Sequence, residues 1–125
     1  MSATAFRLEI TFGDDVATCV WRPTGRELGA APPMHRIPPF LVLEAMARCA
    51  GELLRRDDGR EWMIAGVDDA DLAPVAAGVD VTLTCRVVHR ARGSARVTAS
   101  APPASQARLL MIARTFTTRS DAPAP

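Results

Sequence analysis

Apolar and polar residues alternate at the start of the chain. Residues 6–12, FRLEITF, place a polar side chain at every second position, which is the period of a strand with one buried face. The turn-forming residues GDD at 13–15 separate this run from a second one, VATCVW at 16–21. The pattern predicts a β-hairpin.

A long, nearly uncharged run then predicts a helix. Residues 22–39 hold five prolines and two glycines, so we expect an irregular loop there and a candidate binding segment. Two of these prolines, Pro38 and Pro39, can occupy the start of a helix, where a missing N–H costs little. Good helix formers follow from Phe40 to about Arg56, and Asp57-Asp58-Gly59 ends the run.

The interior of this helix has few polar positions. They are Glu44, Arg48, Gly51 and Glu52. A helix that is apolar nearly all round is a buried one. We therefore expect this helix to be enclosed by protein.

Strand-like alternation returns in the second half of the chain. The predicted strands cover residues 62–67, 79–87, 95–101 and about 108–117, with turn or loop residues between them. A flat sheet would hide one stripe of the helix, whereas a curled sheet covers most of it. The order predicts an α+β fold: a single hot-dog domain, a curled antiparallel sheet wrapped around one long central helix. We assign it to residues 1–118, with a disordered C-terminal tail at 119–125.

Composition and charge exclude several classes of partner and cofactor. The net charge is +1, and 15 basic residues, all Arg, are scattered among 14 acidic ones, so nucleic acid is not an expected partner. Cys19, Cys49 and Cys85 are widely spaced in apolar contexts and form no CxxC pair. They are typical of reduced core residues in a cytoplasmic protein, with no metal and no cofactor. The sequence shows neither an export signal nor a membrane-spanning run.

Glu44 is the main candidate for chemistry. A carboxylate inside an apolar helix costs several kcal/mol unless a partner satisfies it or its proton is used. Arg48 lies four residues later, in the favourable order for an ion pair on one helix face. Glu44 is therefore either catalytic or half of a buried structural pair with Arg48.

Two segments resemble a known family. PPFLVLEAMARCAG resembles PGVLxxEAxAQxxG of the (3R)-hydroxyacyl-acyl carrier protein dehydratases, and AGVDDADLAPVAAGVDVTL resembles their AGIDxARFxxPVxPGDxL. The match runs from about Gly29 to Phe116. The resemblance implies a hot-dog fold and removal of water from a β-hydroxyacyl thioester on acyl carrier protein. In the family, a loop histidine and a helix glutamate of the neighbouring subunit share this task, and Glu44 falls on that glutamate.

This chain departs from the family pattern at the other positions. On an ungapped register, Ala30 stands at the catalytic histidine, although a gapped register of residues 22–39 would change this. Pro39 replaces a glycine whose N–H holds the thioester carbonyl, and loss of such a donor costs ~10²–10³ in rate. The Phe40 amide is a partial substitute. His35 is a candidate only if its loop bends back, since imidazole titrates near neutral pH.

The resemblance and the departures together give three hypotheses. The first is a dehydratase-like lyase subunit in fatty-acid or polyketide biosynthesis, weak alone, in a mixed dimer whose partner supplies the histidine. The second is an acyl thioesterase using the helix carboxylate, and the third is a non-catalytic acyl-binding or structural subunit. All predict a homo- or heterodimer, and we expect acyl carrier protein as the partner that carries the acyl chain. The site residues are Glu44 and His35 as catalytic groups and Phe40 and Arg48 as substrate contacts.

Four arginines gather on one predicted hairpin. They are Arg86, Arg90, Arg92 and Arg96. Such a group is either an ordinary solvated face or a contact for an acidic carrier protein or a phosphate.

Overall fold

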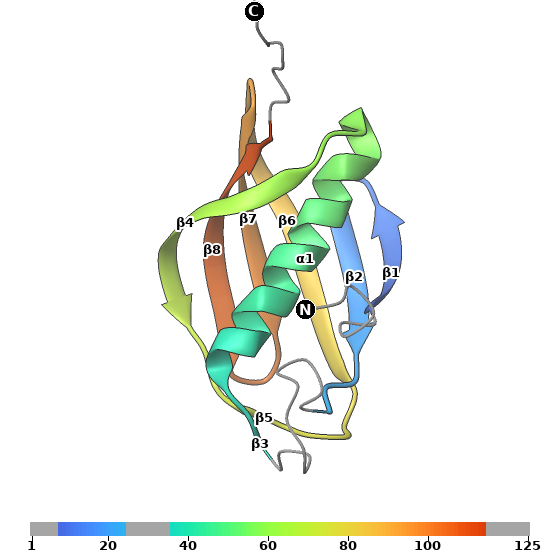
Figure 1. The fold of residues 1–125 in the computed structure, drawn as a ribbon, viewed down its shortest axis with the longest axis vertical. Coiled ribbons are helices and arrows are strands. Elements are labelled where there is room, and N and C mark those ends of the chain that lie inside the picture. Colours follow the sequence, from blue (N-terminus) through green and yellow to red (C-terminus); the bar gives the residue numbers. More distant parts are fainter. Residues whose placement is uncertain (1–7, 25–35, 115–125) are drawn as a thin grey trace, which may run out of the picture.

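A computed structural model describes residues 8–24 and 36–114 of the chain (Figure 1). One helix and eight strands make up this part. They are, in chain order, β1 (Leu8–Gly13), β2 (Val16–Trp21), β3 (Arg36–Ile37), α1 (Pro39–Asp58), β4 (Trp62–Asp71), β5 (Val75–Ala76), β6 (Val81–Ala91), β7 (Ser94–Ala101) and β8 (Ser105–Ala113). The predicted domain end at residue 118 and the predicted tail lie outside the described residues.

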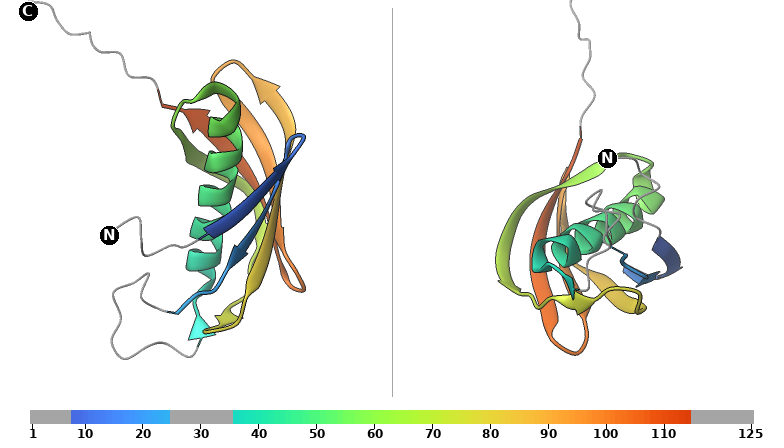
Figure 2. Two further views of the ribbon diagram at one scale, coloured as in Figure 1. Left: turned by 90° about the vertical axis from the view of Figure 1, so that its right-hand side faces the viewer. Right: turned by 60° about the horizontal axis from the view of Figure 1, so that its bottom comes forward.

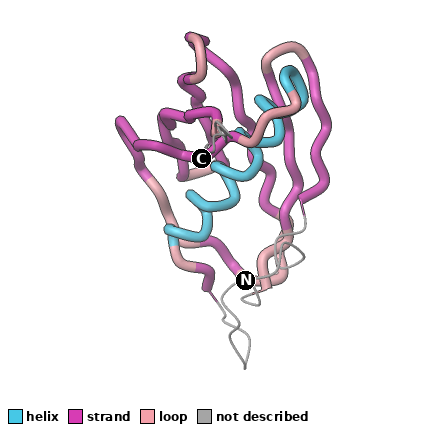
Figure 3. The backbone as a smooth tube through the Cα atoms, turned by 45° about the horizontal axis from the view of Figure 1, so that its top comes forward, coloured by secondary structure: helices cyan, strands magenta, loops and turns pink. Residues whose placement is uncertain are grey.

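Six strands form one antiparallel sheet in the order β1-β2-β6-β7-β8-β4. The sheet curls around α1, and the strands that precede and follow the helix lie on its two sides (Figure 2). This arrangement confirms the predicted hot-dog fold. In Figure 3 the helix crosses the strands on one side of the sheet, and no other described element covers its outer face.

Helix α1 begins and ends with the signals that its sequence carries. Pro39 occupies the first helical position after the extended Pro38, where a missing N–H is tolerated. Gly59 has a φ of 71° and donates its N–H to the Arg55 carbonyl at 2.7 Å, a left-handed cap that glycine adopts without strain. The predicted boundaries are confirmed to within two residues.

The predicted enclosure of α1 is wrong for the single chain. Only one face is buried, through Leu41, Val42, Ala45, Met46, Cys49, Ala50, Leu53 and Leu54. The polar positions Glu44, Arg48, Glu52 and Arg55 recur every three or four residues and therefore share the opposite face. This face is open along much of its length.

The strands differ from their predicted ranges where pairing extends them. β4 continues to Asp71, well beyond the predicted end at 67, because two register shifts keep it paired with β8. β8 begins at Ser105, which pairs with Ala101 across a tight connection. Within the predicted irregular loop, β3 pairs with β5 and fixes the chain just before the helix.

The three cysteines lie in the core, as predicted, and form no disulfide with one another. They come from β2, α1 and β6 and interact with one another. A hydrogen bond with Cys49, together with burial, raises the pKa of the Cys19 thiol. Its bond with Cys19 alone would lower the pKa of the Cys49 thiol, but the bond with Cys85 and burial raise it overall. Buried thiols with raised pKa values are unreactive.

No helix within residues 8–24 and 36–114 combines the length and the apolar character needed to cross a membrane.

Candidate functional site

A groove runs along the exposed face of α1, between β1 and β4. Its volume is about 620 Å³. The helix forms the floor, and apolar side chains of the two strands form the walls. The lining residues are Leu8, Ile10, Glu44, Ala47, Arg48, Gly51, Glu52, Arg55, Glu61, Trp62, Met63, Ile64 and Arg114.

Glu44 lies in this groove and is paired with Arg48. The Arg48 Nε donates to Glu44 Oε2 at 3.0 Å, and the two side chains are 36% and 48% exposed, respectively. The predicted ion pair is confirmed, but the predicted burial of Glu44 is wrong, because its helix face points away from the sheet. The pair orients the carboxylate at the groove surface, where a water or a substrate can reach it.

The other charged side chains of the groove also form pairs of opposite charge. Arg55 lies 3.8 Å from Glu52, and Arg114 lies 3.2 Å from Glu61. The groove therefore carries no strong net field. Its apolar walls suit an uncharged, extended ligand portion more than a polyanion.

Two small residues, Ala47 and Gly51, make room above the helix. A Cβ on Gly51 would lie 3.4 Å from the Trp62 carbonyl oxygen. A methyl group at this position would therefore make an ordinary contact with β4, and glycine leaves that small space open.

The helix start offers one backbone hydrogen-bond donor a helical turn before Glu44, outside the residues that line the groove. The Leu41 amide donates to Pro38 O at 3.0 Å, whereas the Phe40 amide has no partner among the described residues. Phe40 and Glu44 are one helical turn apart, about 6 Å along the axis. The Phe40 side chain is 57% exposed, so its surroundings are accessible. The amide and the helix dipole favour a carbonyl oxygen that gains negative charge.

Hydrogen bonds to Asp58 hold the groove wall at the start of β4. The Trp62 indole N–H donates to both Asp58 carboxylate oxygens, at 3.1 and 3.2 Å, and the Arg60 amide donates to Oδ1 at 2.9 Å. Partial desolvation acts to raise the pKa of Asp58, but these donors hold it below its usual value. Trp62, for which the sequence predicts no site, thus lines the groove in a fixed position.

The edge strand beside the groove exposes apolar side chains in its first six residues. β4 is the last strand in the sheet order, so one side of its backbone has no strand partner there. Met63, Ile64 and Val67 on this strand are 45%, 37% and 40% exposed. Apolar edge strands of this length are prone to pair with another chain.

The other predicted catalytic residue, His35, lies outside the described residues, as does Ala30. The described residues that line the groove include no histidine, and His89 lies on β6, which does not border it. Among the described residues, no group of three or more His, Cys, Asp or Glu side chains could hold a metal ion.

Sequence reasoning missed most of the groove. The spacing of Glu44, Arg48, Glu52 and Arg55 was the available signal, because it marks one polar stripe on the helix. The strand residues of the walls carry no comparable signal, since they join the groove only through the curl of the sheet.

Comparison with solved structures shows the same fold at low sequence identity. A thioesterase superfamily protein from Shewanella loihica is 12% identical with a TM-score of 0.66, over 86% of this chain and 91% of that chain. A conserved protein from Pseudomonas aeruginosa is 18% identical with a TM-score of 0.69, over 91% and 95%. A thioesterase from the same organism, crystallised as a mutant, is 19% identical with a TM-score of 0.63, over 89% and 82%.

No family model and no curated protein matches the sequence. The chain thus has the hot-dog fold of thioesterase-superfamily proteins, and at these identities the likeness shows the fold alone.

Proposed function

We propose that this chain hydrolyses acyl thioesters and that Glu44 is the acting carboxylate. The observation that carries this proposal is the position of Glu44 at the surface of an apolar-walled groove, held by Arg48 at 3.0 Å. The fold it shares with thioesterases supports the same reaction. The thioesterase hypothesis needs only a helix carboxylate and no histidine.

The reaction proceeds by attack of water on the thioester carbonyl. Glu44 accepts a proton from the attacking water, and the carbonyl oxygen becomes an oxyanion that the Phe40 amide and the helix start stabilise. Collapse of this intermediate breaks the carbon–sulfur bond. The thiolate leaves and takes up the proton, so the products are a carboxylic acid and a thiol. The acyl chain lies along the groove above Ala47 and Gly51.

A second copy of the chain belongs to this proposal. Antiparallel pairing of β4 with its counterpart would satisfy the edge backbone and cover Met63, Ile64 and Val67. Such a dimer would shield Glu44 from bulk water.

Dehydration of a β-hydroxyacyl thioester on acyl carrier protein is the competing proposal. It is supported by the two sequence motifs and by Glu44. It requires a histidine, which the described lining of the groove lacks, so it depends on residues 25–35 or on a different partner subunit. Hydrolysis makes no such demand, and we prefer it for that reason.

The test uses the purified chain with two acyl carrier protein thioesters, one saturated and one β-hydroxylated. We expect release of free thiol from the saturated substrate. Glu44→Gln should lower the rate about 10²-fold or more, because it removes the proton acceptor. Glu9→Gln is the matched control, since Glu9 lies on β1 outside the groove lining, and it should leave the rate unchanged.

The outcomes separate the hypotheses. Formation of the unsaturated product without free thiol would replace hydrolysis by dehydration. No turnover of either substrate, in a folded protein, would refute hydrolysis by this chain and leave the non-catalytic hypothesis and the mixed dimer whose partner supplies the histidine. The dimer is tested separately by light scattering: Ile64→Arg should give monomers, and a wild-type chain that is monomeric at micromolar concentration would refute the dimer.

A further inference from the structure

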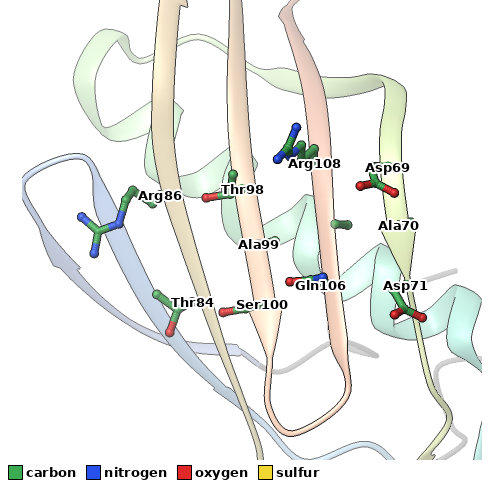
Figure 4. A pocket seen from close by; sticks show the side chains of 11 residues that line it. Asp69, Ala70, Asp71, Thr84, Arg86, Thr98, Ala99, Ser100, Gln106 and Arg108 are labelled. Atoms are coloured by element: carbon green, nitrogen blue, oxygen red, sulfur yellow. The ribbon is translucent and has the colours of Figure 1, made fainter.

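A second hollow lies on the opposite face of the sheet from the helix (Figure 4). Its volume is about 450 Å³, and it opens to solvent. Polar side chains of four strands dominate its lining, while α1 lies behind the sheet in this view. The lining residues are Asp69, Ala70, Asp71, Thr84, Arg86, Thr98, Ala99, Ser100, Gln106, Ala107 and Arg108.

The strand register arranges these side chains in two rows. One row runs Arg86, Thr98, Arg108 and Asp69 from β6 to β4, and the next runs Thr84, Ser100, Gln106 and Asp71. Short hydroxyl side chains on β7 stand between longer ones on the neighbouring strands, and this difference in length makes the hollow. Four strands span about 14 Å.

The charged groups of these rows have no ion-pair partner among the described residues. Arg108 and Asp69 are directly opposite in register, yet no ion pair joins them, and Arg86 and Asp71 are equally unpaired. Two neighbouring arginines, Arg90 and Arg96, do have ion-pair partners.

Arg90 contacts Asp15 at 2.7 Å, and Arg96 is paired with Asp68. Of the arginines on this hairpin, these two are thus already occupied. Arg86 and Arg108, by contrast, line the hollow and have no ion-pair partner among the described residues.

Charge is distributed unevenly along the rows. The arginines lie on β6 and β8, and both carboxylates lie on the edge strand β4. In Figure 4 the Arg108 guanidinium lies beside Thr98, whereas that of Arg86 points to the β2 side of its strand and must rotate to reach the hollow. An anion above Thr98 would be two strands, about 10 Å, from the carboxylates. At physiological salt the Debye length is about 8 Å, so the repulsion is largely screened.

We propose that this hollow binds a phosphate monoester of a small hydroxyl-bearing compound. Arg108 and Arg86 hold the phosphate, and the Thr98 and Ser100 hydroxyl groups donate to its oxygens. Asp69 and Asp71 accept hydrogen bonds from hydroxyl groups at the other end of the ligand. The site is separate from the groove and does not depend on the proposed hydrolysis.

The test is NMR titration of the full chain with ribose 5-phosphate, inorganic phosphate and ribose as separate probes. We expect amide shifts confined to β4, β6, β7 and β8 around the hollow. Ribose 5-phosphate should bind more tightly than inorganic phosphate, because it also reaches the carboxylates, and ribose alone should bind weakest. Shifts along the α1 groove instead would overturn the proposal.

Variants decide which side chains act. Arg108→Gln should weaken binding of ribose 5-phosphate about tenfold through loss of a charged hydrogen bond. Arg92→Gln removes the same charge from the hairpin turn, outside the hollow, and should have little effect. Asp69→Asn should reduce the preference for ribose 5-phosphate over inorganic phosphate.

Two results would refute the site. One is no shift with any phosphate probe at tens of millimolar. The other is an equal loss of binding in Arg108→Gln and Arg92→Gln, which would mean that only net charge matters. Circular dichroism of each exposed-residue variant verifies the fold.

Discussion

The two faces of α1 share one backbone but have opposite surroundings. The face toward the sheet holds residues such as Met46 and Leu54, each 0% exposed. The outward face holds Glu44, Arg48 and Glu52, which are exposed or half-buried and line a groove. One face therefore supplies stability, and the other is free to carry chemistry. Substitutions on the two faces should accordingly affect different properties.

The largest contrast concerns thiol reactivity. Cys19, Cys49 and Cys85 are fully buried, so alkylation should require global unfolding and be slowed by the full free energy of unfolding, about 5–15 kcal/mol. Thiol titration with and without denaturant measures this. Arg55→Cys places a thiol on the outward face, at a side chain that is 59% exposed, and should react at once in the native protein. Rapid reaction of the native cysteines would contradict the core position of this face.

The next largest effect is expected when a buried side chain of α1 is shortened. Leu54→Ala should lower the free energy of unfolding by ~2–5 kcal/mol, because it leaves a cavity between helix and sheet. Urea unfolding followed by circular dichroism measures it. The adjacent Arg55→Ala, on the outward face, should change the free energy of unfolding by less than about 0.5 kcal/mol. Equal losses would mean that the two faces are equally packed.

A substitution at Gly51 tests whether the outward face of α1 has room for a side chain beside β4. Gly51→Ala should stabilise the protein by ~0.5–1 kcal/mol, since alanine favours the helix and its Cβ would make an ordinary contact with Trp62 O at 3.4 Å. Gly59→Ala should destabilise instead, because Gly59 has a φ of 71°. The midpoint of thermal unfolding reports both signs. A destabilising Gly51→Ala would show that β4 cannot yield at this contact.

The smallest expected effect on the free energy of unfolding comes from the ion pair of Glu44 and Arg48. In the monomeric Ile64→Arg background, a double-mutant cycle with Glu44→Gln and Arg48→Gln should give a coupling of ~0.3–0.5 kcal/mol in the free energy of unfolding, since both side chains are well exposed in the single chain. The coupling should shrink in 1 M salt through screening. The same cycle without Ile64→Arg should give a larger coupling, because the proposed dimer shields the pair. Equal couplings in the two backgrounds would mean that the dimer leaves Glu44 exposed.

Most of the fold could be predicted from local pattern. Alternation between 79 and 87 predicted the strand that became β6, and prolines before the run at 40–56 predicted the start of α1. The extensions of β4 and β8 could not be predicted, because they depend on pairing between strands far apart in the sequence.

The site was predicted only in part. The sequence identified Glu44 and its partner Arg48, and their contact is confirmed. It placed the carboxylate in the core, which is wrong. The number of polar residues in a helix does not show which face is exposed, whereas their angular positions around the helix axis do. The walls of the groove and the outer hollow were not predicted at all. His35 stays a prediction.

The sequence by itself determined the helix, its ends, the burial of the cysteines and the identity of the groove carboxylate, because these follow from local propensity, capping and hydrophobic period. Tertiary structure alone decided which face of α1 stays open, and it gathered Thr98, Arg108 and Asp69 from three strands into one hollow. The physical reason is that both outcomes depend on strand order, register and curl, which arise from contacts between distant segments.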